Sequence, residues 1–213
     1  MDTAINEPIL VAHGLSLITR QGTVFEGVDL TLSAGEVCAL LGAEGSGKTA
    51  LLLTFAGRMK QTAGTLEVAG LTLPKQRYKA QRLVGMGFFA GLNEAQPSLT
   101  VEATVAAELH FSNRANDERS TAHYLHLWGL QAFAGTAVKD LTSEQRLRLG
   151  IALGMAGGQR VLVLDSIEDG LDNAQSTHAL NYLKAVAIDT GIAVVFGCLE
   201  EQLAARATHH YRL

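Results

Sequence analysis

The sequence has few cysteines and no excess of basic residues. Two of its 213 residues are cysteine. Cys38 and Cys198 both lie in apolar, strand-like runs, which predicts two small buried side chains in a reducing compartment rather than a disulfide. The formal net charge is −4 and the isoelectric point is about 6.0. This balance provides no basic face for nucleic acid, so we expect no nucleic-acid partner.

Long apolar segments are also missing, which limits how the chain can meet a membrane. No apolar run approaches the roughly 20 residues that span a bilayer. The first ten residues, MDTAINEPIL, lack the basic start and the apolar stretch of a signal peptide. We therefore expect a soluble, cytoplasmic protein, and any association with a membrane must come through a partner.

Apolar residues are abundant, and their order predicts an α/β fold. They make up 47% of the chain, and 213 residues suffice for one large domain or a core with a small subdomain. Residues 99–148 carry apolar residues at helical spacing, and a further helix is predicted at 175–187. Alternation of strands and helices implies a mostly parallel sheet flanked by helices. The predicted strands are 9–12, 28–32, 64–70, 83–89, 161–165, 192–196 and an edge strand at 209–213.

The most informative motif is the run Gly42 to Thr49. Its sequence, GAEGSGKT, matches the phosphate-binding pattern G-x-x-x-x-G-K-[ST] at every fixed position. A strand-like run precedes it and a helix-like run follows, as this motif requires. Glycines let the backbone wrap around an anion, and Lys48 is expected to reach the β- and γ-phosphates. The predicted nucleotide-binding residues are Gly42, Ala43, Glu44, Gly45, Ser46, Gly47, Lys48, Thr49 and Ala50.

An acid later in the chain completes a predicted magnesium site. Asp165 ends the apolar run 161–164, and in P-loop NTPases the magnesium acid ends a buried strand. The alternative is that Asp165 caps the following helix. We expect a nucleoside triphosphate and Mg²⁺ as cofactors, with the Thr49 hydroxyl and the Asp165 carboxylate at the metal.

The ordered series of motifs resembles the nucleotide-binding subunit of the ATP-binding cassette (ABC) family over nearly the whole chain. Asp165 lies twenty residues after Gln145, as in the family, and Gly170-Leu171-Asp172 resembles the family's D-loop. The resemblance implies a P-loop NTPase fold with an N-terminal antiparallel β subdomain. It divides a single domain, 1–213, into a core (1–89 and 149–213) and a helical subdomain at about 90–148. It also implies an integral membrane transporter subunit and a second cassette, identical or different, as partners. Through these subunits the chain would lie on the inner face of the membrane.

Positions associated with hydrolysis depart from the family pattern. Ser166 stands where the family has the glutamate that activates or orients the attacking water. Phe89 aligns with the Q-loop glutamine, and Cys198 with the switch histidine that touches the γ-phosphate. Thr19 aligns with the aromatic residue that stacks on adenine. Glu168 and Asp169 are close enough in sequence to substitute for the missing glutamate.

The signature motif is altered as well. The family has L-S-G-G-Q, and this chain has Leu141-Thr142-Ser143-Glu144-Gln145. Ser143 and Glu144 replace both glycines. In the family this segment closes over the γ-phosphate held by a partner subunit, so Glu144 brings a carboxylate towards a polyanion unless its side chain turns away.

Side chains outside these motifs also receive predictions. We expect Phe25 and Phe88 in the core and His209 and His210 at the surface. In the family, a groove between the core and the helical insert receives a short helix of the membrane subunit. Phe89 and Leu92 fall near that groove, and either could form part of a docking patch.

Three functions follow, of which we favour the first. A degenerate cassette subunit would bind ATP or ADP and hydrolyse ATP slowly or not at all, acting as a structural or regulatory half. A working transporter ATPase with unusual replacements is the second. The third is a P-loop protein outside transport, such as a small-molecule kinase or a soluble assembly factor.

Overall fold

The computed structural model describes residues 7–213. Residues 1–6, which carry most of the segment used to judge a signal peptide, lie outside the described residues. No helix among the described residues is long and apolar enough to cross a membrane.

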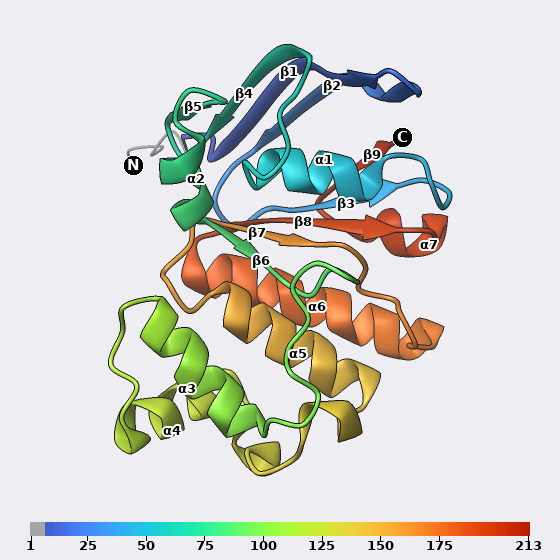
Figure 1. Cartoon of the computed structure of the whole chain (residues 1–213). Helices are drawn as coiled ribbons and strands as arrows, with labels where there is room; N and C mark the ends of the chain where they lie inside the picture. Colours follow the sequence, from blue (N-terminus) through green and yellow to red (C-terminus); the bar gives the residue numbers. More distant parts are fainter. Residues whose placement is uncertain (1–6) are drawn as a thin grey trace, which may run out of the picture.

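An antiparallel sheet forms one layer of the molecule (Figure 1). Its strand order is β2-β1-β4-β5, and β1 and β2 make a long hairpin closed where Thr19 pairs with Gly22. The predicted strands at 9–12 and 28–32 are therefore the ends of longer strands. Gly14 and Gly27 lie inside these strands, at register shifts of the pairing. The strands are β1 (Leu10–Thr19), β2 (Gly22–Leu32), β4 (Ala63–Val68) and β5 (Leu71–Leu73).

A parallel sheet forms the central layer, as the sequence predicts. Its order is β6-β7-β8-β3-β9, and every neighbouring pair runs parallel. All residues of β3, β7 and β8 are buried, because both faces of the sheet are covered. The predicted edge strand at the end of the chain is β9. The strands are β3 (Val37–Leu41), β6 (Val84–Met86), β7 (Val161–Leu164), β8 (Ala193–Cys198) and β9 (His209–Arg212).

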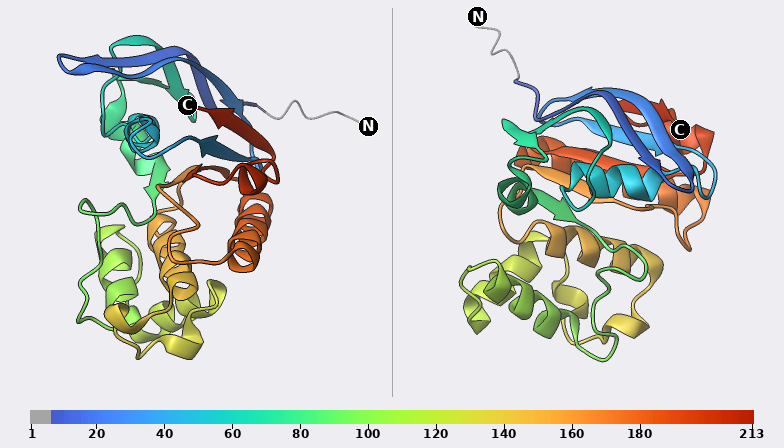
Figure 2. Two further views of the ribbon diagram at one scale, coloured as in Figure 1. Left: turned by 90° about the vertical axis from the view of Figure 1, so that its right-hand side faces the viewer. Right: turned by 45° about the horizontal axis from the view of Figure 1, so that its top comes forward.

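Two hydrophobic cores lie on the two faces of the parallel sheet. In one, α1 (Lys48–Phe55) lies between the two sheets, where Leu51, Leu52 and Phe55 are buried. Figure 2 shows this helix enclosed between the layers. Phe25 belongs to this core, as predicted. The other core joins the opposite face to α5 (Ser143–Gly154), α6 (Asn173–Thr190) and the helical segment.

The helical segment predicted at 99–148 is present beyond the parallel sheet (Figure 1). Tyr124 fixes one of its helices to α5 by donating a hydrogen bond to the carbonyl of Ala152 at 2.6 Å. The short helices α2 (Arg77–Leu83) and α7 (Glu201–Ala204) have no counterpart among the sequence predictions. The elements of the segment before α5 are α3 (Val101–Phe111), α4 (Glu118–Leu127) and the 3₁₀ turns Gln131–Phe133 and Val138–Asp140.

Candidate functional site

The candidate site lies at the carboxyl ends of β3, β7 and β8, which are neighbours in the parallel sheet. The loop Gly42–Gly47 joins β3 to α1 there. The first residue of the loop is hydrogen-bonded to β8, the neighbouring strand of the sheet: the Gly42 amide donates to the Cys198 carbonyl at 3.2 Å. Carboxyl ends of parallel strands and the following helix N-terminus are where α/β proteins bind ligands.

Two glycines of this loop lie in close contact with their neighbours. Gly47 has φ +97° at the N-cap of α1, and a Cβ there would lie 2.3 Å from the Val24 carbonyl oxygen. The close approach of β2 therefore requires glycine at this position. A Cβ on Gly42 would lie 2.4 Å from Ser46 Oγ, because the loop curls tightly between these two residues.

The polar groups of the loop fit an anionic ligand. Lys48 Nζ donates to the carbonyl oxygens of Gly42 at 2.6 Å and Ala43 at 2.8 Å, so the ammonium lies over the loop. Ser46 Oγ is buried and has no hydrogen-bond partner within residues 7–213. Glu44 is exposed to solvent. A positive group and an unused hydroxyl inside a glycine-rich turn suit phosphate oxygens.

The two predicted metal ligands, 116 positions apart in sequence, meet in the structure. Thr49 Oγ1 donates a hydrogen bond to Asp165 Oδ1 at 2.7 Å. The helix-cap alternative for Asp165 is wrong, because the N-cap of α6 is Asp172. Within the described part of the chain no group of three or more His, Cys, Asp or Glu side chains could hold a metal. One carboxylate and one hydroxyl match the way Mg²⁺ is bound, with phosphates and water supplying further oxygens.

The side chain after Asp165 is neutral. Ser166 Oγ accepts a hydrogen bond from the Glu168 amide at 3.3 Å and thus takes part in the turn after β7. A serine hydroxyl is no general base near neutral pH without a base of its own.

Glu168 and Asp169, the two candidate substitutes, differ in environment. Asp169 is exposed. Glu168 is half-buried and points to the turn after β8, where its Oε1 accepts a hydrogen bond from the Leu199 amide at 2.6 Å. Burial raises the pKa of Glu168, the charges of Glu200 and Asp169 add to the increase, and the Leu199 amide opposes it.

The raised pKa predicts that Glu168→Gln stabilises the protein near neutral pH. A carboxyl whose folded-state pKa lies above its unfolded value contributes stability at low pH that is lost as the pH rises through the folded-state pKa. Glutamine does not ionise, so the Glu168→Gln variant does not lose this stability as the pH rises. Urea unfolding at pH 7.5 and pH 4.5 should show the variant more stable than the wild type at pH 7.5, with a smaller difference at pH 4.5. Glu67→Gln, at an exposed glutamate of β4, is the matched control, and a difference independent of pH would contradict the prediction.

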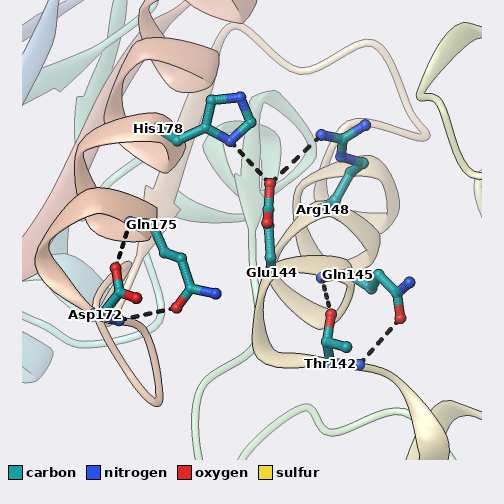
Figure 3. A network of polar contacts seen from close by, with 7 residues as sticks. All are labelled: Thr142, Glu144, Gln145, Arg148, Asp172, Gln175 and His178. Carbon is teal, nitrogen blue, oxygen red and sulfur yellow. Dashed lines mark hydrogen bonds and ion pairs between the residues drawn. The ribbon is translucent and has the colours of Figure 1, made fainter.

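The signature-like segment begins α5 (Figure 3). Thr142 is the N-cap, its Oγ1 accepts from the Gln145 amide at 3.3 Å, and the Gln145 side chain accepts from the Thr142 amide at 3.0 Å. This reciprocal pair is a capping box, a purely local sequence effect. A Cβ on Gly170 would lie 2.5 Å from Ser143 Oγ, so the D-loop-like turn packs directly on this segment.

Glu144 is turned towards α6 and along α5. Its Oε1 lies 2.9 Å from His178 Nδ1 and 4.0 Å from Arg148 Nη2. Figure 3 shows the carboxylate between these two side chains. His178 has no role in the sequence predictions, and its partner lies 34 positions away. The Glu144 carboxylate therefore faces two basic side chains of its own chain. This matches the alternative in which Glu144 turns away from the γ-phosphate held by a partner subunit.

The prediction for the two phenylalanines after β6 is wrong in part. Phe89 is fully buried in the core around α1. Phe88, which was expected in the core, is only partly buried, and the Arg146 guanidinium carbon lies over its ring, 5.0 Å from the centroid of the Phe88 ring. The strand β6 ends at Met86, so the alternation that would place Phe88 with Val84 and Met86 is broken. Phe89 takes the core position instead.

A groove of about 1160 Å³ lies beside these residues. It runs between the end of β6 and α3, and its apolar lining includes Phe88, Leu92, Leu99 and Phe111. Leu92 is 60% exposed and Phe111 is 82% exposed. Leu92 therefore lies exposed in this groove, whose lining is both polar and apolar, whereas Phe89 does not.

The remaining predicted side chains lie as expected. Cys38 and Cys198 are buried and free. Burial raises the pKa of Cys38 to about 12 and that of Cys198 to about 11, so both thiols stay protonated. His209 and His210 are exposed.

Comparison with known proteins assigns the family. The protein-family model described as ABC transporter matches residues 25–167, which is more than half of the chain. The chain belongs to the ABC transporter family. The matched range includes the P-loop, the signature-like segment and Asp165, so the family assignment rests on the same residues as the site.

Curated relatives within this ABC family include ATP-binding proteins of several transporters. The chain is 30% identical over 190 residues to the uncharacterized ABC transporter ATP-binding protein YdbJ of Bacillus subtilis (strain 168), covering 89% of this chain and 61% of that protein. It is 34% identical over 204 residues to a putative ABC transporter ATP-binding protein of Streptomyces avermitilis, covering 93% and 35%. It is 31% identical over 210 residues to the hemin import ATP-binding protein HmuV of Vibrio cholerae, and the match covers 92% of this chain and 79% of HmuV. The chain thus spans less than two thirds of the first two relatives.

Solved ABC structures share the fold. A dimeric bacterial ABC transporter cassette superposes with a TM-score of 0.80 at 20% identity, covering 96% of this chain and 94% of that chain. CbiO1 from Clostridium perfringens, part of the ABC transporter complex cbiONQ, gives 0.77 at 22% identity, covering 91% and 79%. The antiparallel sheet, the parallel sheet and the flanking helices are therefore those of an ABC cassette.

Proposed function

We propose that this ABC chain binds ATP·Mg and hydrolyses it slowly or not at all. The nucleotide would be held by Gly42–Ala50 and the metal by Thr49 and Asp165. The observation that carries the proposal is the contrast between the Thr49–Asp165 contact at 2.7 Å and the neutral Ser166 beside it. The chain keeps the groups that bind phosphate and magnesium, and it has no carboxylate at the position that would activate water.

The surroundings of Ser166 support weak hydrolysis. Glu168, the nearer substitute, directs Oε1 to the Leu199 amide. Asp169 is exposed. Cys198 is buried and protonated, so it supplies neither the charge nor the imidazole of a switch histidine. Loss of a general base alone typically costs about 10²- to 10⁴-fold in rate.

The proposed setting is a membrane transporter complex, with this chain on the inner face of the membrane as a structural or regulatory half. The groove lined by Leu92, Leu99 and Phe111 would receive the integral membrane subunit, because exposed apolar surface of this kind marks a binding site. The second cassette would be another copy or a different chain. We propose one domain over 1–213, with a helical subdomain at about 90–148.

A working transporter ATPase is the second candidate, and one observation favours it. Glu144 faces His178 and Arg148, which removes part of the expected repulsion of a γ-phosphate by the signature-like segment. The segment also keeps the Thr142 hydroxyl at the N-terminus of α5, where helix amides favour an anion. The family match argues against the third expectation, a P-loop protein outside transport such as a small-molecule kinase or a soluble assembly factor.

Titration calorimetry with ATP·Mg, paired with a phosphate-release assay on the same preparation, separates these functions. We expect saturable binding and a turnover far below 1 s⁻¹, the lower end of ordinary enzyme rates. Turnover on the order of 1 s⁻¹ or faster would establish the working ATPase instead. An absence of nucleotide binding would refute both candidates. ADP·Mg in place of ATP·Mg tests whether the γ-phosphate contributes to binding.

A further inference from the structure

One peptide group joins the loop after β7 to the first residue of the P-loop. The carbonyl of the Cys198–Leu199 peptide accepts a hydrogen bond from the Gly42 amide at 3.2 Å. The N–H of the same peptide donates to Glu168 Oε1 at 2.6 Å. Hydrogen bonds on the two ends of one peptide polarise each other.

The neighbouring contacts leave this peptide little freedom. A Cβ on Gly197 would lie 2.3 Å from the Asp165 carbonyl oxygen and 3.6 Å from Lys48 Cδ. The end of β8 therefore packs closely against the backbone of Asp165 on one side and against the Lys48 side chain on the other. A change in how Glu168 holds Leu199 is therefore passed on to Gly42.

The position of Glu168 is unfavourable for stability by itself. Its Oε2 is buried and accepts no hydrogen bond from the described residues. A buried, half-paired carboxyl group costs free energy that a smaller or apolar residue would avoid. Residues held at such a cost are concentrated at functional sites.

We propose that Glu168 is a positioning residue for the nucleotide site, which holds the first P-loop residue in place through the Cys198–Leu199 peptide. This inference rests on the proposed nucleotide binding. Glu168 acts on Gly42 and touches no nucleotide itself. The oxygen of a glutamine at this position keeps the hydrogen bond to Leu199, whereas alanine removes it.

Amide hydrogen exchange by NMR in the nucleotide-free protein tests the link directly. In Glu168→Ala we expect exchange of both the Leu199 and the Gly42 amides to accelerate about tenfold relative to the Val163 amide in the core. Glu168→Gln and the control Glu67→Gln, at an exposed glutamate of β4, should leave both ratios near the wild-type value. Acceleration at Leu199 alone, with Gly42 unchanged, would overturn the proposal and leave Glu168 a merely local role. If the alanine variant does not fold, Glu168→Asp, which withdraws the carboxylate by one methylene, should produce the same paired change.

Nucleotide titration then separates this inference from the proposed function. Glu168→Ala should weaken ATP·Mg binding about tenfold while Glu168→Gln binds like the wild type. If the wild type binds no nucleotide, the proposed function fails, and the exchange result still decides whether Glu168 positions Gly42. If the wild type binds ATP·Mg and the alanine variant binds equally well, the positioning role fails and the proposed function stands.

Discussion

Replacing Ser166 with glutamate is expected to raise the rate of ATP hydrolysis by about 10²- to 10⁴-fold, the usual contribution of a general base. The carboxylate would stand directly after Asp165, next in sequence to the Thr49–Asp165 pair that we propose holds the metal. A cavity of about 110 Å³ adjoins Ser166 and is lined by Ser143, Arg146 and Asp169, so a longer side chain has room. Phosphate release at saturating ATP·Mg and pH 7.5 measures the effect.

Ser166→Gln is the matched control for this gain. Glutamine has the size of glutamate and can hydrogen-bond water, and it cannot accept a proton from it. The double variant Ser166→Glu/Lys48→Ala should lose the gained activity, which would place the turnover in this site. Equal rates for the glutamate and glutamine variants, with ATP·Mg bound in both, would show that Ser166 does not limit hydrolysis.

Replacing Lys48 with alanine should weaken ATP·Mg binding by roughly 10²-fold. Hydrogen bonds to charged groups contribute about 1.5–3 kcal/mol, and a loss of 2.7 kcal/mol would correspond to about 10²-fold in Kd. Lys48 Nζ already lies over the loop, bound to the Gly42 and Ala43 carbonyls, so its ammonium needs little rearrangement to meet phosphates. Titration calorimetry measures the change.

Lys60→Ala serves as the control for lost charge, because Lys60 is exposed and lies outside the loop. It should bind ATP·Mg like the wild type. Circular dichroism on the Lys48→Ala variant must show an intact fold, since the two carbonyls that Lys48 caps are then left to water. Unchanged affinity in a folded Lys48→Ala protein would mean that the loop does not bind the phosphates of ATP.

Residues at the ends of strands show where sequence reasoning succeeds and fails. The strand before the P-loop and the buried strand before Asp165 were predictable, because continuous apolar runs indicate strands covered on both faces. Phe88 and Phe89 were not, because β6 stops at Met86 and the alternation of side chains stops with it. The helices that cover each face decide which ring is buried.

The sequence by itself determined the P-loop, the capping box of α5 and the alternation of strands and helices. Each of these depends on residues that are adjacent or a few positions apart, so local backbone geometry and periodicity determine them. Only the tertiary structure decided the contacts of Glu144 with His178 and of Glu168 with Leu199, whose partners lie 34 and 31 positions away. Such contacts depend on which turns the packed core brings together at one edge of the sheet. The direction of a carboxylate at that edge depends on its nearest partner in space, which the local sequence pattern does not specify.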